Sequence, residues 1–324
     1  MALTRRQQWR INKVQSEKIA RSNKASIKAE SNVDNNEAGH KGLVITRYGQ
    51  RQLVELKSGE IFQAVSRQNI GFSVAGDQVL LQTTKEGEGI VTAIFPRKTE
   101  LKRQERLIAA NIDQLWLIVA IEPHYQFELI DRYLVIAEDS NLPINIVVNK
   151  IELSKNSEQL ESDFSNYQEL GYDVHFLSVK NETNLKEFKT KLVNKSHIFL
   201  GQSGVGKSSL INSLIPDLEL RVNEISSKSK LGKHTTTNTT IYHIPSGGDL
   251  IDSPGIREFG LWHFEPSEIL KGFIDIEEYS GGCRFRDCRH ENTPGCAIES
   301  AVESRDIHPD RYHSFKRILS GLDD

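Results

Sequence analysis

The sequence of 324 residues lacks the features that would make it a secreted or membrane-spanning protein. It has three cysteines, all between positions 283 and 296, and an odd number so closely spaced argues against a disulfide framework. The densest apolar stretch, residues 116–121, is far too short to cross a bilayer. The start MALTRRQQWRINK has no apolar core of a secretory signal. We therefore expect a cytoplasmic protein without a membrane partner.

The sequence also lacks an excess of charge of either sign. Its 41 Lys and Arg residues against 44 Asp and Glu residues give a net charge of −3, so the whole chain offers no electrostatic argument for a polyanionic partner. The distribution is uneven, because residues 1–29 carry eight basic side chains against Glu17 alone. We interpret residues 1–40 as a flexible basic arm, which either contacts a phosphate backbone or is simply solvated.

Short β-type runs separated by turn residues extend from Gly42 to about Pro96. Five such strands in so few residues, with no helical period, predict a small barrel for residues 41–102. The five-stranded oligonucleotide-binding (OB) type is the leading interpretation, and an SH3-like barrel remains open.

From about Ile112 strands alternate with amphipathic helices. This alternation predicts an α/β domain with a mostly parallel sheet that is covered on both faces. Ligands of such sheets bind at the carboxyl ends of the strands, so we expect the chemistry in the loops there.

A phosphate-binding loop follows the apolar run HIFL and precedes SSLINSLI. Its glycines let backbone N–H groups surround phosphates, while Lys207 reaches the β- and γ-phosphates and Ser208 ligates Mg²⁺. A helix that begins near Lys207 adds its positive dipole end. The candidate residues are Gly201, Gln202, Ser203, Gly204, Val205, Gly206, Lys207, Ser208 and Ser209.

Further downstream, DLIDSPGI places Asp252 at the end of a short strand. An aspartate here can hold Mg²⁺ through water, and the N–H of Gly255 can meet the γ-phosphate. In the polar loop KLGKHTTTNTT, the hydroxyl of Thr236 is our candidate to complete the Mg²⁺ coordination.

Two strand ends carry residues that suit a guanine base. In VVNKIE, the carboxylate of Glu152 can accept from the ring N1–H and the exocyclic amine, Asn149 supports the base edge, and the Lys150 stem covers its face. One β-α-β unit later, FLSVK supplies Ser178 and Lys180 for the guanine O6 and the opposite face.

These base-recognition motifs precede the phosphate loop, whereas ordinary GTPases place them after it. The chain in this respect resembles the circularly permuted GTPases, and most closely the ribosome small subunit-dependent GTPase A (RsgA) family, over roughly residues 40–320. The resemblance implies an OB fold for residues 42–96, a permuted GTPase domain at 103–275, and GTP hydrolysis to GDP stimulated by the small ribosomal subunit during its late maturation. It also implies contact with rRNA, and we expect a monomer. One departure is Glu152, which replaces the usual aspartate.

The residue that orients the attacking water is not the usual one, since Ile256 follows the D-x-x-G motif where many GTPases have glutamine. His234, beside the threonines, is our candidate for water positioning, and the resemblance supports it because the family has a histidine in its HTTT segment. The alternative is an RNA- or ribosome-binding module in which nucleotide is mainly a structural or switching ligand.

The cysteines form a metal-ligand pattern with one histidine. Cys283, Cys288, His290 and Cys296 give three thiolates and one imidazole, a closed set suited to structural Zn²⁺. We expect residues 276–324 to form a small zinc-binding domain that ends in a basic helix. The arginines around the ligands and in that helix can contact RNA or protein, or be solvated.

Overall fold

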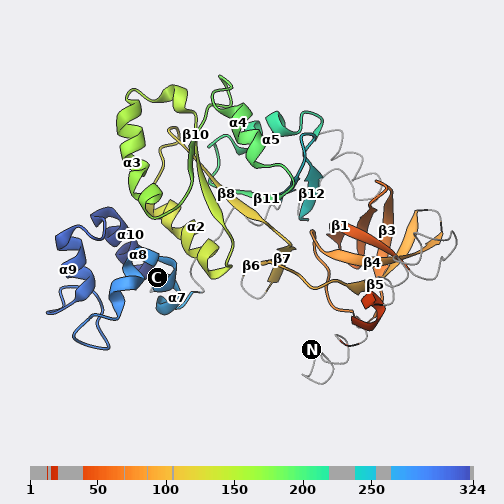
Figure 1. The fold of residues 1–324 in the computed structure, drawn as a ribbon, viewed down its shortest axis with the longest axis horizontal. Helices are drawn as coiled ribbons and strands as arrows, with labels where there is room; N and C mark the ends of the chain where they lie inside the picture. The colour runs from red at the N-terminus through yellow and green to blue at the C-terminus, as the bar shows by residue number, and fades with distance from the viewer. Residues whose placement is uncertain are drawn as a thin grey trace. The chain divides into compact units, whose positions relative to one another are not determined.

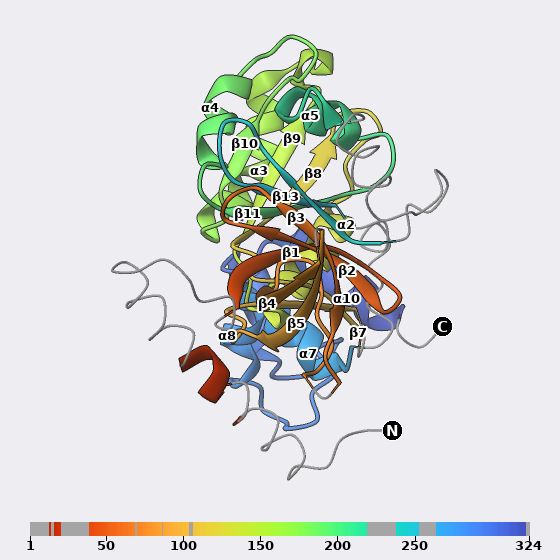
Figure 2. The same cartoon turned by 90° about the vertical axis from the view of Figure 1, so that its right-hand side faces the viewer.

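The computed structural model describes residues 13, 16–20, 39–68, 70–85, 87–103, 106–218, 238–252 and 264–321. The chain forms two compact units. The first contains residues 1–112, 216–244 and 249–255, and the second contains residues 113–215, 245–248 and 256–324. Each unit has its own strands and its own buried residues (Figures 1 and 2).

Five strands of the first unit close into a barrel, drawn in red to orange in Figure 2. Strand β1 pairs antiparallel with both β2 and β4, β2 pairs with β3, and β5 joins β3 in parallel and β4 in antiparallel orientation. The closed order 1-2-3-5-4-1 is that of the OB fold, which confirms the predicted barrel and excludes the SH3-like alternative. The strands are β1 His40–Tyr48, β2 Arg51–Leu56, β3 Ile61–Ser66, β4 Gln78–Lys85 and β5 Glu88–Ile94.

The barrel closes around a cluster of apolar side chains, most of them small or β-branched, from the five strands and the β3–β4 loop. Side chains of this kind suit a pleated, half-buried surface, and each strand buries one face in the barrel interior. A bulge between Val44 and Thr46 shifts the register of β1 against β2 and bends the strand. The cluster contains Val44, Val54, Ala64, Ile70, Val79, Leu81 and Val91.

Two hairpins of the first unit lie outside the barrel. β6 Glu100–Arg103 pairs with β7 Arg106–Ala110, a hairpin that the sequence analysis did not anticipate. β12 Thr240–His243 pairs with β13 Asp249–Asp252, the short strand that we expected before Asp252. β12 also pairs with the barrel strand β1, at Thr46 and Thr240.

The second unit contains the parallel sheet, in the order β10-β9-β8-β11. Every strand and helix expected between residues 112 and 215 is present, which confirms the α/β prediction. Strands β8 and β9 are almost wholly buried, as strands covered on both faces are. The strands are β8 Gln114–Ala120, β9 Ile144–Asn149, β10 Val174–Phe176 and β11 Ser196–Leu200, and the helices are α2 Phe127–Asp139, η1 Ile151–Leu153, α3 Ser157–Glu169, α4 Leu185–Lys191 and α5 Lys207–Leu214.

Four helices at the C-terminal end belong to the same unit (Figure 1). They are α7 Pro266–Gly272, α8 Ile274–Ser280, α9 Ala297–Ser304 and α10 Pro309–Ser320. α7 packs closely on α2, because a Cβ at Gly272 would lie 2.7 Å from the Cα of Val135. Among the described residues, the model contains no helix with the length and apolarity that a bilayer span requires.

A buried ion-pair network joins α10 to α2 and α8. Arg311 is only 1% exposed, and its guanidinium donates to Asp131 at 2.5 Å and to Asp275 at 2.7 and 3.1 Å. Tyr167 on α3 donates to the same oxygen of Asp131 at 2.9 Å. From the sequence we expected the basic residues of this terminal helix to be on the surface, but Arg311 is a core residue and is not available to a partner.

Candidate nucleotide-binding site and metal centre

The loop between β11 and α5 has a shape that only glycine allows at two positions. Gly201 and Gly206 have φ angles of 129° and 95°. A Cβ at Gly201 would lie 2.1 Å from the carbonyl oxygen of Ile118, and one at Gly206 would lie 2.3 Å from the Nδ2 atom of Asn149. The loop therefore runs directly against β8 and β9, and it leads into the N-terminal end of α5, where backbone N–H groups favour an anion.

The side chains of this loop are arranged along the start of α5. Lys207 donates from its Nζ atom to the carbonyl oxygens of Gly201 and Gln202, the latter at 2.5 Å, so its ammonium group lies along the loop. Ser203, Gly204, Ser208 and Ser209 are exposed, and Val205 is buried. An ammonium group and a hydroxyl at an exposed helix start are the groups that bind a phosphate chain and its Mg²⁺.

Asn149 connects the base motif with the phosphate loop. It is 2% exposed at the end of β9, and its Nδ2 atom donates to the carbonyl oxygen of Val205 at 2.9 Å. Its Oδ1 atom accepts from the backbone N–H of Val179 at 3.3 Å, within the SVK segment. Three segments that are far apart in the sequence therefore meet at one amide.

Lys150 lies against the other side of the phosphate loop. Its backbone is left-handed, with a φ angle of 62°, and its Nζ atom donates to the carbonyl oxygens of Glu122 at 2.6 Å and Gly204 at 2.8 Å. These contacts direct its aliphatic stem from the end of β9 toward the loop, as required of a side chain that covers the face of a base.

Glu152 has the feature that points most directly to a ligand. It lies in η1, and its Oε2 atom is buried without a hydrogen-bond partner among the described residues. A buried carboxylate oxygen that lacks a donor is costly. The N1–H and exocyclic amine of a guanine are donors that would satisfy it.

The SVK segment divides into a buried and an exposed part. The Oγ atom of Ser178 accepts from the backbone N–H of Asn181 at 3.0 Å, and its own N–H donates to the carbonyl oxygen of Thr183 at 3.1 Å. Lys180 is exposed. The structure thus holds Ser178 rigidly and leaves Lys180 accessible to a ligand.

The remaining nucleotide-site candidates do not belong to the described part of the second unit. Asp252 ends β13 in the first unit and is half-buried. His234, Thr236 and Gly255 lie outside the residues that the structure describes. Their roles stay predictions.

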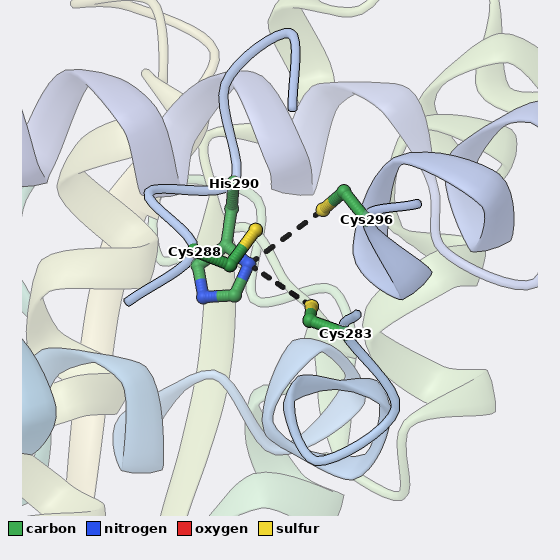
Figure 3. Close-up of side chains that lie close together, drawn as sticks. All are labelled: Cys283, Cys288, His290 and Cys296. Atoms are coloured by element: carbon green, nitrogen blue, oxygen red, sulfur yellow. Dashed lines mark hydrogen bonds between the residues drawn. The ribbon is translucent and has the colours of Figure 1, made fainter. Parts of the chain in front are cut away.

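The four expected metal ligands form one cluster in the C-terminal module (Figure 3). Their ligand atoms all lie within 4.8 Å of one another. The Nδ1 atom of His290 is 3.5 Å from the Sγ atom of Cys283 and 3.6 Å from that of Cys296. Two ligands of a tetrahedral ion with bond lengths of about 2.0 and 2.3 Å are separated by about 3.5 Å, so the cluster has the dimensions of a metal site.

The surroundings of the cluster also suit metal ligation. Burial lowers the pKa of His290, which favours the neutral imidazole that binds metals, and burial raises the pKa of the Cys296 thiol to about 12. A divalent cation beside that thiol would reverse the latter effect. Tyr312 on α10 donates to the carbonyl oxygen of His290 at 2.7 Å and so attaches the metal loop to the terminal helix.

Two sets of charged residues that the structure brings together were not predicted from the sequence. One is Arg311 with Asp131 and Asp275, three residues far apart in the sequence. The other is His243 of β12, whose ring nitrogens contact Asp249 and Glu55 at 2.5 Å each. No sequence motif marks either set, because the partners become neighbours only through the fold.

The second unit has a parallel sheet with a phosphate loop. Its base motif precedes this loop in the sequence and contacts it in the fold. Together these features define a P-loop GTPase of the circularly permuted class. Solved structures agree with this class. The crystal structure of YloQ, a circularly permuted GTPase, matches with a TM-score of 0.72 and 27% identity, over 91% of this chain and 98% of that one. YjeQ from Thermotoga maritima matches with a TM-score of 0.71 and 29% identity, over 87% and 98%.

Sequence comparisons specify the family. The family model described as RsgA GTPase matches residues 94–262. The small ribosomal subunit biogenesis GTPase RsgA of Hahella chejuensis is 42% identical over 99% of this chain and 96% of its own length, and that of Marinobacter nauticus is 43% identical over the same shares. The chain belongs to the RsgA GTPase family.

Proposed function

We propose that this chain hydrolyses GTP to GDP and phosphate during late maturation of the small ribosomal subunit. The observation that carries the proposal is the position of Asn149, whose amide contacts both the phosphate loop and the SVK segment. A nucleotide bound along the phosphate loop and past Asn149 has its phosphates at the start of α5 and its base at η1. The relatives from Hahella chejuensis and Marinobacter nauticus are named small ribosomal subunit biogenesis GTPases.

The base half of the proposed site selects guanine. The Oε2 atom of Glu152, which has no partner among the described residues, accepts from the guanine N1–H, and the stem of Lys150 covers one face of the ring. Ser178 and Lys180 face the O6 side and the opposite face. Adenine has no donor at N1 and an amine in place of O6, so it fits this set of groups poorly.

The phosphate half of the proposed site binds the phosphate chain, whose γ-phosphoryl group is transferred to water. Lys207 leaves the loop carbonyls for the β- and γ-phosphates, and the backbone N–H groups of residues 201–206 surround the chain of phosphates. Ser208, Asp252 and Thr236 would hold Mg²⁺, and the ion would neutralise charge on the phosphate oxygens. The N–H of Gly255 donates a hydrogen bond to a γ-phosphate oxygen.

Water activation falls to His234, since Ile256 cannot orient a water molecule. A neutral imidazole in the loop next to Thr236 accepts a proton from the attacking water or holds it in line. A site that lacks the usual glutamine turns over slowly alone, so we propose that the small subunit completes it. Partner-supplied groups raise GTP hydrolysis elsewhere by roughly 10³–10⁵.

The other parts of the chain serve recognition of the particle. We assign residues 41–102 to an rRNA-binding barrel, 103–275 to the GTPase domain and 276–324 to a structural zinc domain, preceded by the basic arm at 1–40. The Cys₃His cluster supports the zinc assignment, because a closed set of three thiolates and one imidazole is typical of structural Zn²⁺. The protein acts as a cytoplasmic monomer.

The test is steady-state hydrolysis of GTP and ATP by metal-replete protein, alone and with purified small subunits, large subunits or bulk RNA. We expect slow GTP turnover alone and strong stimulation by small subunits only. His234→Ala should lose the stimulated rate and keep its affinity for GDP. Equal rates in every condition would support the alternative, a binding module in which nucleotide is a structural or switching ligand.

A further inference from the structure

The barrel exposes one aromatic ring that is already stacked. Phe72, in the β3–β4 loop, is 56% exposed, more than any other large hydrophobic residue that the structure describes as exposed. The guanidinium carbon of Arg47 lies 3.8 Å from the centre of its ring. A planar cation therefore covers part of the ring, and more than half of the residue's surface remains open.

The arginine of this stack is held in place by hydrogen bonds. Arg47 Nη1 donates to the carbonyl oxygen of Ser73 at 3.2 Å and to its Oγ atom at 3.0 Å, and Nε donates to the carbonyl oxygen of Gly49 at 3.2 Å. Ser73 in turn donates to the buried side chain of Gln52. Arg47 thereby joins the β1–β2 loop to the β3–β4 loop, and its guanidinium plane cannot rotate freely.

The backbone of Phe72 is held as firmly. Its carbonyl oxygen accepts from Arg97 at 2.7 Å, and Arg97 makes a two-point ion pair with the fully buried Asp77, at 2.7 and 2.9 Å. Asp77 also accepts from the backbone N–H of Val74 at 2.8 Å. A ring that is exposed on a rigid loop loses little entropy when a ligand stacks on it.

The chain segments that contain the two stacked residues carry only basic charges, and the acidic Asp77 near Phe72 is buried and paired with Arg97. Residues 47–52 and 65–73 contain three arginines, Arg47, Arg51 and Arg67, and no Asp or Glu. Arg51 pairs in register with Val65, which is 44% exposed. Lys18 of the basic arm donates to the carbonyl oxygen of Thr92 at 3.3 Å, and its pKa is lowered by burial and by the charge of Arg67. This surface suits a polyanion.

We propose that the Arg47–Phe72 stack is a platform for one unpaired base of RNA, with Arg51 and Arg67 on the flanking phosphates. The proposal rests on the ribosomal role above and specifies where and how the barrel meets RNA. Stacking on an aromatic ring needs an unstacked base, so single-stranded or bulged RNA binds and a regular duplex does not. Arginines can also pair with the carboxylates of a protein, so a protein partner is an outcome that the experiment distinguishes.

The experiment measures binding of the full-length protein to an unstructured RNA decamer that carries one 2-aminopurine. Fluorescence anisotropy gives the affinity, and quenching of the 2-aminopurine fluorescence reports stacking of that base. We expect Phe72→Ala to weaken binding roughly 5- to 150-fold, as loss of one stacked base does, and to abolish the quenching. Phe72→Trp should retain the affinity and the quenching, and Phe72→Leu should behave like Phe72→Ala. Arg67→Gln should reduce the salt dependence of binding by about one phosphate contact and leave the quenching.

The controls separate this platform from the proposed function. Val193→Ala, an exposed apolar residue of the second unit, should bind RNA as the wild type does, and basal GTP turnover of every variant should be unchanged. Unchanged RNA affinity in Phe72→Ala overturns the platform. If that variant binds RNA normally but binds small subunits weakly, Phe72 contacts a ribosomal protein, and base stacking is again wrong. Failure of small subunits to stimulate the wild type refutes the function, whatever the oligonucleotide shows.

Discussion

At the scale of single residues, the nucleotide site depends on side chains that each serve two segments. Asn149 accepts from Val179 and donates to Val205, and Lys150 binds the carbonyl oxygens of Glu122 and Gly204. The hydrogen-bonding groups of these side chains have their partners within the protein itself. Glu152 differs, because its buried Oε2 atom has no partner among the described residues. It is therefore our candidate for the residue that selects the base.

Glu152→Gln exchanges a group that only accepts for one that accepts and donates. Hydrogen bonds to a charged group contribute about 1.5–3 kcal/mol, so we expect GDP affinity to fall roughly 10- to 100-fold. The affinity for xanthosine diphosphate, which has an oxygen in place of the exocyclic amine, should fall less than that for GDP or should rise. Titration calorimetry with both nucleotides measures this, with Glu158→Gln on the exposed start of α3 as the matched control. Equal losses for both nucleotides would contradict the assigned role.

At the scale of elements, two charged clusters attach one segment to another. His243 places the β12–β13 hairpin against barrel strand β2 through Asp249 and Glu55. Arg311 attaches α10 to α2 and α8. The first cluster is partly exposed and has a titratable histidine as its cation, whereas the second is buried and has an arginine, whose pKa is raised by Asp131 and Asp275. They should therefore respond differently to pH and to substitution.

The His243 cluster should make stability depend on pH. Hydrogen bonds to Asp249 and Glu55 raise the pKa of His243 to about 10, from an unfolded value of 6.5. Because the folded pKa is the higher one, the contribution is complete below about pH 6.5 and is lost as the pH rises through about 10. The difference in urea midpoint between the wild type and His243→Gln should thus shrink from pH 6 to pH 10. A difference that stays constant over this range would show that the imidazole acts without its charge.

Removal of Arg311 should loosen the C-terminal helices. Arg311→Met leaves two buried carboxylates, Asp131 and Asp275, without their cation, and breaking a buried pair in this way costs about 3–5 kcal/mol. Urea unfolding of the second unit, followed by tryptophan fluorescence, measures the loss. Arg317→Met on the same helix is the control, because Arg317 is 73% exposed and lies 4.0 Å from Glu128. Similar effects in the two variants would mean that burial of the pair is unimportant.

At the scale of the whole molecule, the metal loop and the nucleotide loop belong to the same compact unit but are built on different elements. The metal ligands lie on the segment that leads into α9, and Tyr312 attaches that segment to α10. The phosphate loop lies between β11 and α5. Loss of one site should therefore leave the other largely intact.

Chelation of the metal tests this separation. We expect about one zinc per chain by elemental analysis, and its removal should unfold the loop, since zinc binding contributes roughly 10–16 kcal/mol in small modules. Limited proteolysis should then cut between residues 283 and 296, while GDP affinity changes less than about threefold. Cys288→Ser should behave like the chelated protein. Resistance to protease after complete removal of the metal would show that the module folds without it.

Local patterns were sufficient to predict much of this protein. Five short strands, the strand–helix alternation, the phosphate loop and the Cys₃His spacing can each be read within a short window, because each depends on neighbours in the chain. Their order along the sequence also revealed the permutation. Features of this kind require no knowledge of which distant residues meet.

Only the tertiary structure decided the rest. Closure of β1 on β4 excluded the SH3-like barrel, and packing of α10 on α2 turned Arg311 from an apparent surface charge into a buried one. The stack of Arg47 on Phe72 joins strand β1 to the β3–β4 loop, which no motif connects. These contacts bring together residues distant in sequence, and their strength depends on burial and geometry, which composition and spacing do not contain.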